Sequence, residues 1–116
     1  MVISVPGPPE GLRALQSSVS SVLLTWLPPD PPTGEVLSYT LYHRPPHAHT
    51  TSHHPMSARS GAHTLHHLTK GTHNFWLRAR TRMGEGPPTP TIELNLSDNG
   101  NIFISNYFFI CFILCI

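Results

Sequence analysis

Hydrophobic and polar positions alternate with a period of two in two clear segments of this 116-residue chain. In residues 20–26, Val22, Leu24 and Trp26 fall on one face of an extended chain. In residues 73–82 the alternation is strict, with inward positions His73, Phe75, Leu77 and Ala79 and outward positions Trp76, Arg78, Arg80 and Arg82. Successive side chains of a strand point to opposite faces of its sheet, so both segments predict half-buried strands.

Weaker patterns predict further strands. Residues 36–44 place Tyr39, Leu41 and His43 on one face, opposite Thr40, Tyr42 and Arg44. A short strand is expected at residues 64–65, with His63 and Leu65 inward and Leu68 capping the following turn. A last strand has Ile92, Leu94 and Leu96 inward. Residues 45–62 are polar and show no apolar period, which predicts long loops around at most one or two short edge strands.

Prolines and glycines separate these segments. Pro28 and Pro29 follow the first strand, Pro45 and Pro46 end the next, and residues 84–88 are Gly-Glu-Gly-Pro-Pro. Proline cannot donate a hydrogen bond to a β-ladder, so each strand must stop there. Short strands between turn signals, with no helical period, predict an all-β sandwich of two antiparallel sheets. The predicted core consists of Trp26, Tyr39, Leu41, Leu68, Phe75 and Leu77.

The composition excludes several classes of function. The length fits a single domain. Only 11% of residues are charged and the net charge is +1, so no global field attracts nucleic acid or an anionic membrane. Cys111 and Cys115 both lie in the last six residues, so no disulfide is expected in the core. Six scattered acidic residues and no nucleotide-binding motif predict no enzyme and no cofactor.

Several marks along the chain together carry a family resemblance. They are Pro8-Pro9 with Leu12, Trp26-Leu27-Pro28-Pro29, Tyr39 and Leu41, Leu68, and Ala79 five residues before Gly84-Glu85-Gly86. In this order and spacing they resemble a fibronectin type III domain. Residues 39–44 and 75–86 resemble, more narrowly, repeats of the Down syndrome cell adhesion molecule family. The resemblance implies a seven-stranded antiparallel immunoglobulin-like sandwich over residues 6–97, preceded by an extension at 1–5 and followed by an apolar tail at 98–116.

Some residues depart from the family pattern. His73 stands where the family usually has a tyrosine whose hydroxyl bonds to the preceding corner, and Lys70 replaces a family proline in that corner. Leu68 lies one residue closer to this position than usual, which puts the corner bond in doubt. His43 and His63 also occupy positions that are often aromatic. We expect reduced stability, because one lost buried hydrogen bond costs roughly 1 kcal/mol.

The resemblance also implies a function. We expect a non-catalytic extracellular interaction and spacer module of a cell adhesion receptor, as a fragment of a larger tandem-repeat protein at the cell membrane. Its partners would be other cell-surface domains, bound homophilically or heterophilically, and neighbouring fibronectin or immunoglobulin repeats, with no nucleic acid. The alternative is an intracellular scaffold-type module. Asn95-Leu96-Ser97 is an N-glycosylation acceptor if the chain enters the secretory route.

One face of the predicted sandwich is rich in aromatic and basic side chains. In the fibronectin topology its outward residues are Tyr42, Arg44, Trp76, Arg78 and Arg80, with Glu93 nearby. One hypothesis is a cation–π ladder that covers and stiffens the sheet. The other is a protein-binding face, because Trp, Tyr and Arg are enriched at interface hot spots. We favour the ladder, since the outer face of one strand is a small patch.

All nine histidines lie between residues 43 and 73. A metal site is one hypothesis, with His47, His49, His53 and His54 as candidate ligands, because imidazoles at such spacing chelate zinc, nickel or copper. A pH switch is a second, because the unperturbed pKa of histidine lies near 6.5. We favour the third, a compositionally biased set of solvated loops, since structural zinc needs a rigid frame.

The two ends carry signals of their own. Residues 1–5 lack a basic segment and a long apolar stretch, so they are not expected to be a signal peptide. Residues 101–116 are apolar, but only ten residues follow Asn106, whereas a bilayer span needs roughly 20. A truncated membrane helix, a lipid-anchor signal or sequence outside the natural domain would each account for this tail, and we favour the last. Membrane contact is expected only through the tail or a parent protein.

Overall fold

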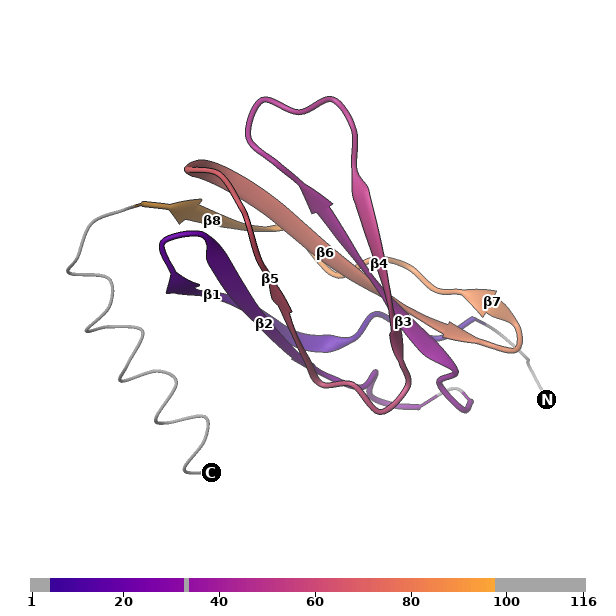
Figure 1. Cartoon of the computed structure of the whole chain (residues 1–116). Coiled ribbons are helices and arrows are strands. Elements are labelled where there is room, and N and C mark those ends of the chain that lie inside the picture. The colour runs from indigo at the N-terminus through magenta and orange to yellow at the C-terminus, as the bar shows by residue number, and fades with distance from the viewer. Residues whose placement is uncertain (1–4, 33, 98–116) are drawn as a thin grey trace, which may run out of the picture.

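The computed structural model describes residues 5–32 and 34–97 and shows two antiparallel β-sheets packed face to face (Figure 1). The described strands are β1 (Glu10–Ser18), β2 (Ser21–Leu27), β3 (Ser38–Arg44), β4 (Ser52–Ser57), β5 (Ala62–Leu65), β6 (Gly71–Thr81), β7 (Gly84–Glu85) and β8 (Ile92–Leu96). One sheet has the order β1-β2-β5. In the other, β4, β3 and β6 are neighbours, and β7 and β8 both pair with β6. No helix among these residues is long and apolar enough to cross a bilayer.

The core lies between the sheets, on the faces that the alternation of side chains predicts. Its buried hydrophobic residues are Val22, Leu24, Trp26, Tyr39, Leu41, Leu65, Phe75, Leu77, Ala79 and Leu96. Leu68 is only partly buried and packs against this cluster, while its backbone N–H donates to the Ser20 carbonyl at 2.8 Å. The strands β3 and β6 pair in register over seven residues from Ser38↔Arg80 to Arg44↔Asn74, which fixes which of their side chains meet.

Strand β1 is the element whose limits the sequence pattern does not define. Its most buried residue is the polar Gln16, at 4% exposure, so no apolar alternation marks the segment. The Gln16 amide faces the end of β8: Nε2 donates to the Ser97 carbonyl at 2.6 Å, and Oε1 accepts from the Ser97 N–H at 3.4 Å. The Gln16 side chain therefore joins β1 to the end of β8, two strands that are not paired through their backbones. These bonds also satisfy the buried amide, as a buried polar group requires.

Other boundaries differ from expectation by a few residues. Strand β3 begins at Ser38 rather than Val36. The residue before it, Leu37, is exposed, and its N–H donates to the Arg80 carbonyl at 2.7 Å. Strand β6 ends at Thr81, so Arg82 lies outside it. Gly84–Glu85, expected only as a connection, pairs with β6 as β7. The polar segment holds β4, whose preceding loop projects beyond the sheets (Figure 1). The predicted tail at 98–116 lies outside the described residues.

The corner between β5 and β6 keeps its side-chain anchor. His73 is fully buried, and its Nε2 lies 2.7 Å from the Thr69 carbonyl oxygen. A carbonyl only accepts, so Nε2 carries the proton and donates. Histidine therefore makes the corner bond that the shortened spacing puts in doubt, because the imidazole reaches a carbonyl four residues upstream.

Candidate functional site

The outer face of β3 and β6 brings four of the five predicted interaction residues into one ladder. Tyr42 and Trp76 are paired across the strands, and their rings stack with centroids 5.7 Å apart and planes inclined by 2°. The Arg44 guanidinium carbon lies 5.6 Å from the Trp76 centroid, and that of Arg78 lies 5.7 Å from the Tyr42 centroid. Each cation therefore covers one end of the aromatic pair, which is a favourable electrostatic arrangement.

Glu85 on β7 closes one end of this ladder. The Tyr42 hydroxyl donates to its carboxylate, and the Arg78 Nε lies 3.6 Å from Glu85 Oε1. Burial raises the pKa of Tyr42, and the bond to Glu85 raises it further. Arg78 also donates to the Gly86 carbonyl at 3.4 Å. The carboxylate thus neutralises one ladder arginine and holds the tyrosine in one orientation.

The sequence reasoning missed two members of this face. His53 on β4 packs edge-on against Tyr42, with centroids 4.8 Å apart. Glu85 on β7 supplies the carboxylate that contacts the ladder, whereas Glu93 on β8 is exposed and lies opposite Asn74 of β6. In the sequence, the glycines on either side of Glu85 are the signal for this contact, because they allow the tight turn after which β7 pairs with β6.

Arg80 differs from the other four. It is exposed on the same face of β6, and its backbone pairs with Ser38 of β3 and Glu85 of β7. Within residues 5–32 and 34–97, its guanidinium makes no hydrogen bond, ion pair or ring contact. The ladder arginines are already engaged, so Arg80 is the predicted interaction residue whose donors remain available at the edge of this face.

The candidate metal ligands do not converge. His47 and His49 are exposed in the loop before β4, and His47 has a positive φ of 59°. His53 contacts Tyr42 on the outer face, whereas His54 faces inward, 6.0 Å from the ring centroid of His63. Among the residues the structure describes, no group of three or more His, Cys, Asp or Glu side chains is placed to hold a metal ion.

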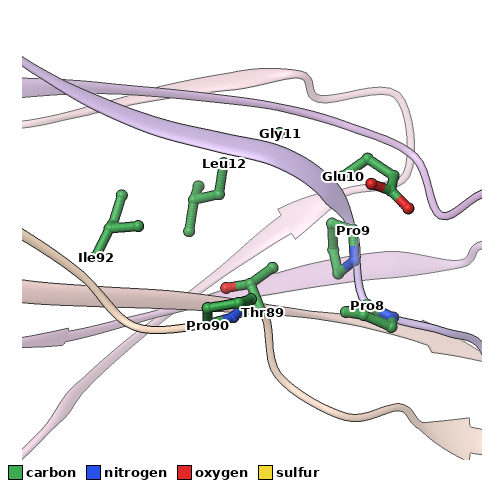
Figure 2. A pocket seen from close by; sticks show the side chains of 8 residues that line it. All are labelled: Pro8, Pro9, Glu10, Gly11, Leu12, Thr89, Pro90 and Ile92. Atoms are coloured by element: carbon green, nitrogen blue, oxygen red, sulfur yellow. The ribbon is translucent and has the colours of Figure 1, made fainter.

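A groove of about 340 Å³ lies between the start of β1 and the chain entering β8 (Figure 2). Its lining is mostly apolar and consists of Pro8, Pro9, Glu10, Gly11, Leu12, Thr89, Pro90 and Ile92. The Thr89 hydroxyl already accepts the Leu77 N–H at 3.0 Å. None of these lining residues belongs to the aromatic ladder, and among them Glu10 is the one ionisable side chain.

Two packed antiparallel sheets, their strand order and the anchored corner define an immunoglobulin-like β-sandwich. The sequence model of the fibronectin type III domain matches residues 7–95, and the chain belongs to that family. The fold agrees, since the crystal structure of chicken CNTN1 FN1-FN3 domains superposes with a TM-score of 0.71 at 19% identity. That match covers 79% of this chain and 32% of the other.

Two curated relatives indicate the kind of protein in which such a domain occurs. Mouse cell adhesion molecule DSCAML1 is 36% identical over 93 residues, covering 78% of this chain and 4% of the relative. Human receptor-type tyrosine-protein phosphatase F is 34% identical over 96 residues, covering 75% of this chain and 5% of the relative. The chain is thus similar to a small part of much longer adhesion and receptor-type proteins. Domains of this family are generally non-catalytic.

Proposed function

We propose that the chain is a non-catalytic extracellular module that binds other cell-surface protein domains through the outer face of β3 and β6. The observation that carries the proposal is the stacked Tyr42–Trp76 pair, covered by Arg44 and Arg78, with the exposed Arg80 beside it. Aromatic and arginine side chains dominate interface hot spots. Side chains already held in place lose little conformational entropy on binding, so such a face favours affinity.

The same fold suits a spacer role. Relatives in which this chain matches only 4–5% of the length leave room for many further domains, and neighbouring fibronectin or immunoglobulin repeats would be its covalent partners. The proposed place of action is the extracellular side of the cell membrane, as part of a larger adhesion receptor. The groove near Pro9 offers no nucleophile paired with a base, which supports a role without catalysis.

Arg80→Ala tests the binding face with little risk to the fold, because the side chain is exposed and makes no interaction among the described residues. Beads coated with this chain report homophilic adhesion by aggregation, and binding of the fluorescent chain to cultured cells reports heterophilic adhesion. We expect Arg80→Ala to weaken whichever interaction occurs by about 10-fold, the size of a modest hot spot. Arg13→Ala removes an exposed cation from β1, on the other sheet, and serves as the matched control.

Equal binding by the Arg80→Ala, Arg13→Ala and parent chains would rule out this face as the contact. Thermal melts of the three proteins must coincide for the comparison to hold. Loss of binding in both variants would instead indicate a general dependence on positive charge.

Glycosylation of Asn95 distinguishes the proposed extracellular module from the alternative, an intracellular scaffold-type module. Asn95 is exposed on β8 and lies opposite Thr72 of β6, so a glycan meets no steric obstacle from the described residues. We expect the protein expressed in its own cells to lose one glycan when Asn95 is replaced by glutamine. The variant should migrate faster in gel electrophoresis, and treatment with peptide N-glycosidase should abolish the difference. Identical mobility of the two proteins would favour the intracellular alternative.

A further inference from the structure

Four histidines that face the interior meet where the two sheets approach each other. His43 on β3 and His73 on β6 are buried, while His54 on β4 and His63 on β5 are partly buried. They come from four different strands and both sheets. The exposed loop histidines, His47, His49, His66 and His67, are separate from this cluster.

The two buried rings form a directed chain of hydrogen bonds. His73 donates through Nε2 to the Thr69 carbonyl, so in the neutral ring its Nδ1 is an acceptor. His43 Nε2 lies 2.8 Å from that Nδ1 and must therefore carry the donated proton. His43 also stacks on Phe75, with centroids 5.0 Å apart and planes inclined by 14°. This arrangement uses both histidines in their neutral forms.

A proton added to either buried ring would disrupt this arrangement. A proton added to His73 Nδ1 would set two N–H groups against each other at 2.8 Å. A proton added to His43 would place a charge against the Phe75 ring, between the sheets. Burying a charge without a counter-charge is costly.

The remaining side of the cluster lies between strands β4 and β5. His54 packs against His63 across the two sheets, with ring centroids 6.0 Å apart, and its Nε2 is buried without a hydrogen-bond partner among the described residues. In the described part of the chain, β4 pairs only with β3, so it is an edge strand. Positive charge on both rings would push β4 away from β5.

We propose that His43, His54, His63 and His73 form an acid-sensitive latch, which holds β4 and the β5–β6 corner at neutral pH and releases them as the pH falls toward 5. The inference is independent of the adhesion proposal, since it concerns the interior of the sandwich. It narrows the pH hypothesis from all nine histidines to this internal group.

The electrostatic surroundings agree with this geometry. Burial, together with smaller contributions from His73 and His54, lowers the pKa of His43 to about 4. Burial also lowers the pKa of His54, with contributions from His63 and His53. The charged groups that act on these two rings are all histidines, whereas β8 contributes the apolar Leu94 opposite His73 and Glu93 on the exposed face.

The sign follows from proton linkage. His43 has a pKa of about 4 in the folded protein and an ordinary value of 6.5 when unfolded, so the unfolded chain binds more protons between these values. Its contribution to stability is complete above the unfolded pKa and is lost as the pH falls toward 4. Between pH 7.5 and 5.0, His43 alone lowers the folding equilibrium constant about 30-fold.

Urea unfolding at pH 7.5 and 5.0 tests the latch in the parent chain, in His43→Phe and in the exposed control His49→Gln. Phenylalanine keeps the stacking on Phe75 but cannot bind a proton. We expect the parent and His49→Gln to lose at least about 30-fold in the folding constant, and His43→Phe to lose at least 10-fold less. Hydrogen exchange, corrected for intrinsic rates, should show greater loss of protection in β4 than in β2.

Equal pH dependence in the parent and His43→Phe would overturn the latch, as would unchanged protection of β4 at pH 5.0. If His43→Phe does not fold at pH 7.5, His54→Gln replaces it, because that position is less buried and its ring nitrogen has no partner to lose among the described residues. Because His43 remains in that variant, its readout is hydrogen exchange: a loss of β4 protection at pH 5.0 as large as in the parent would contradict the proposal.

Discussion

Replacing Trp26 by alanine is expected to remove about 3–5 kcal/mol from the free energy of unfolding, the usual cost of truncating a buried tryptophan. Trp26 is 4% exposed on β2 and meets the Tyr39 ring edge-on, with centroids 5.7 Å apart and planes at 64°. A domain has only about 5–15 kcal/mol of stability, so most of it would be lost. Urea titration followed by far-ultraviolet circular dichroism measures the change.

Trp26→Phe is the matched control, and its expected cost is smaller than that of alanine, because phenylalanine keeps an aromatic ring in the core and leaves a smaller cavity. The Trp26 indole nitrogen is buried without a hydrogen-bond partner among the described residues, so phenylalanine removes a polar group that carries a desolvation penalty. The two substitutions together separate ring volume from the indole N–H. Equal costs for phenylalanine and alanine would mean that the N–H makes a needed hydrogen bond, contrary to this account.

Much of the fold follows from alternation in a few segments. The strands β2 and β6 are clear in the sequence because apolar residues recur at every second position, as at Val22 and Leu24 and at Phe75 and Leu77, and all four are fully buried. Strand β1 is not clear, since its most buried side chain is Gln16, whose partner Ser97 is 81 residues away. Local periodicity cannot reveal a hydrogen bond between the two ends of a domain.

The outer face was predictable to a similar extent. Strand alternation alone places Tyr42 and Trp76 outward, and the family topology makes β3 and β6 neighbours. The stacking of their rings depends on the register Tyr42↔Trp76, which only the folded pairing fixes. His53 reaches the ladder because β4 pairs with β3 in a segment whose sequence has no apolar period. Glu85 reaches it because a two-residue strand returns along β6.

The interior histidines show a different limit of sequence reasoning. His43 and His73 were assigned inward faces by alternation, and they are buried there. Their mutual hydrogen bond is a consequence of packing, since the two rings are not cross-strand partners: His43 pairs with Phe75, two residues along β6 from His73. The pair fills its place in the core with two planar rings and joins that part of the core to the corner through the Thr69 carbonyl.

Gly86→Ala is expected to cost about 2–3 kcal/mol, near the upper end for a group forced into filled space. A Cβ added at Gly86 would lie 2.2 Å from the Pro6 carbonyl oxygen and 3.0 Å from Pro6 Cγ. The first of these contacts is with backbone, so no side-chain rotation relieves it. Gly86 is itself fixed, because its N–H donates to the Ala79 carbonyl at 2.9 Å and its carbonyl accepts from Arg78. Urea titration gives the loss in unfolding free energy.

Gly61→Ala is the matched control, because a Cβ there would lie 3.6 Å from the Trp26 carbonyl oxygen, an ordinary contact. A chain that starts after Pro6 provides the second test, since the clash is absent from it. In that background Gly86→Ala should cost less than about 1 kcal/mol, and the difference between the two backgrounds is the coupling energy between Gly86 and Pro6. An unchanged cost would show that alanine disturbs the β6–β7 hairpin itself. A reduced cost would show that the glycine after Glu85 is required for the N-terminal segment to lie against the hairpin that completes the ladder.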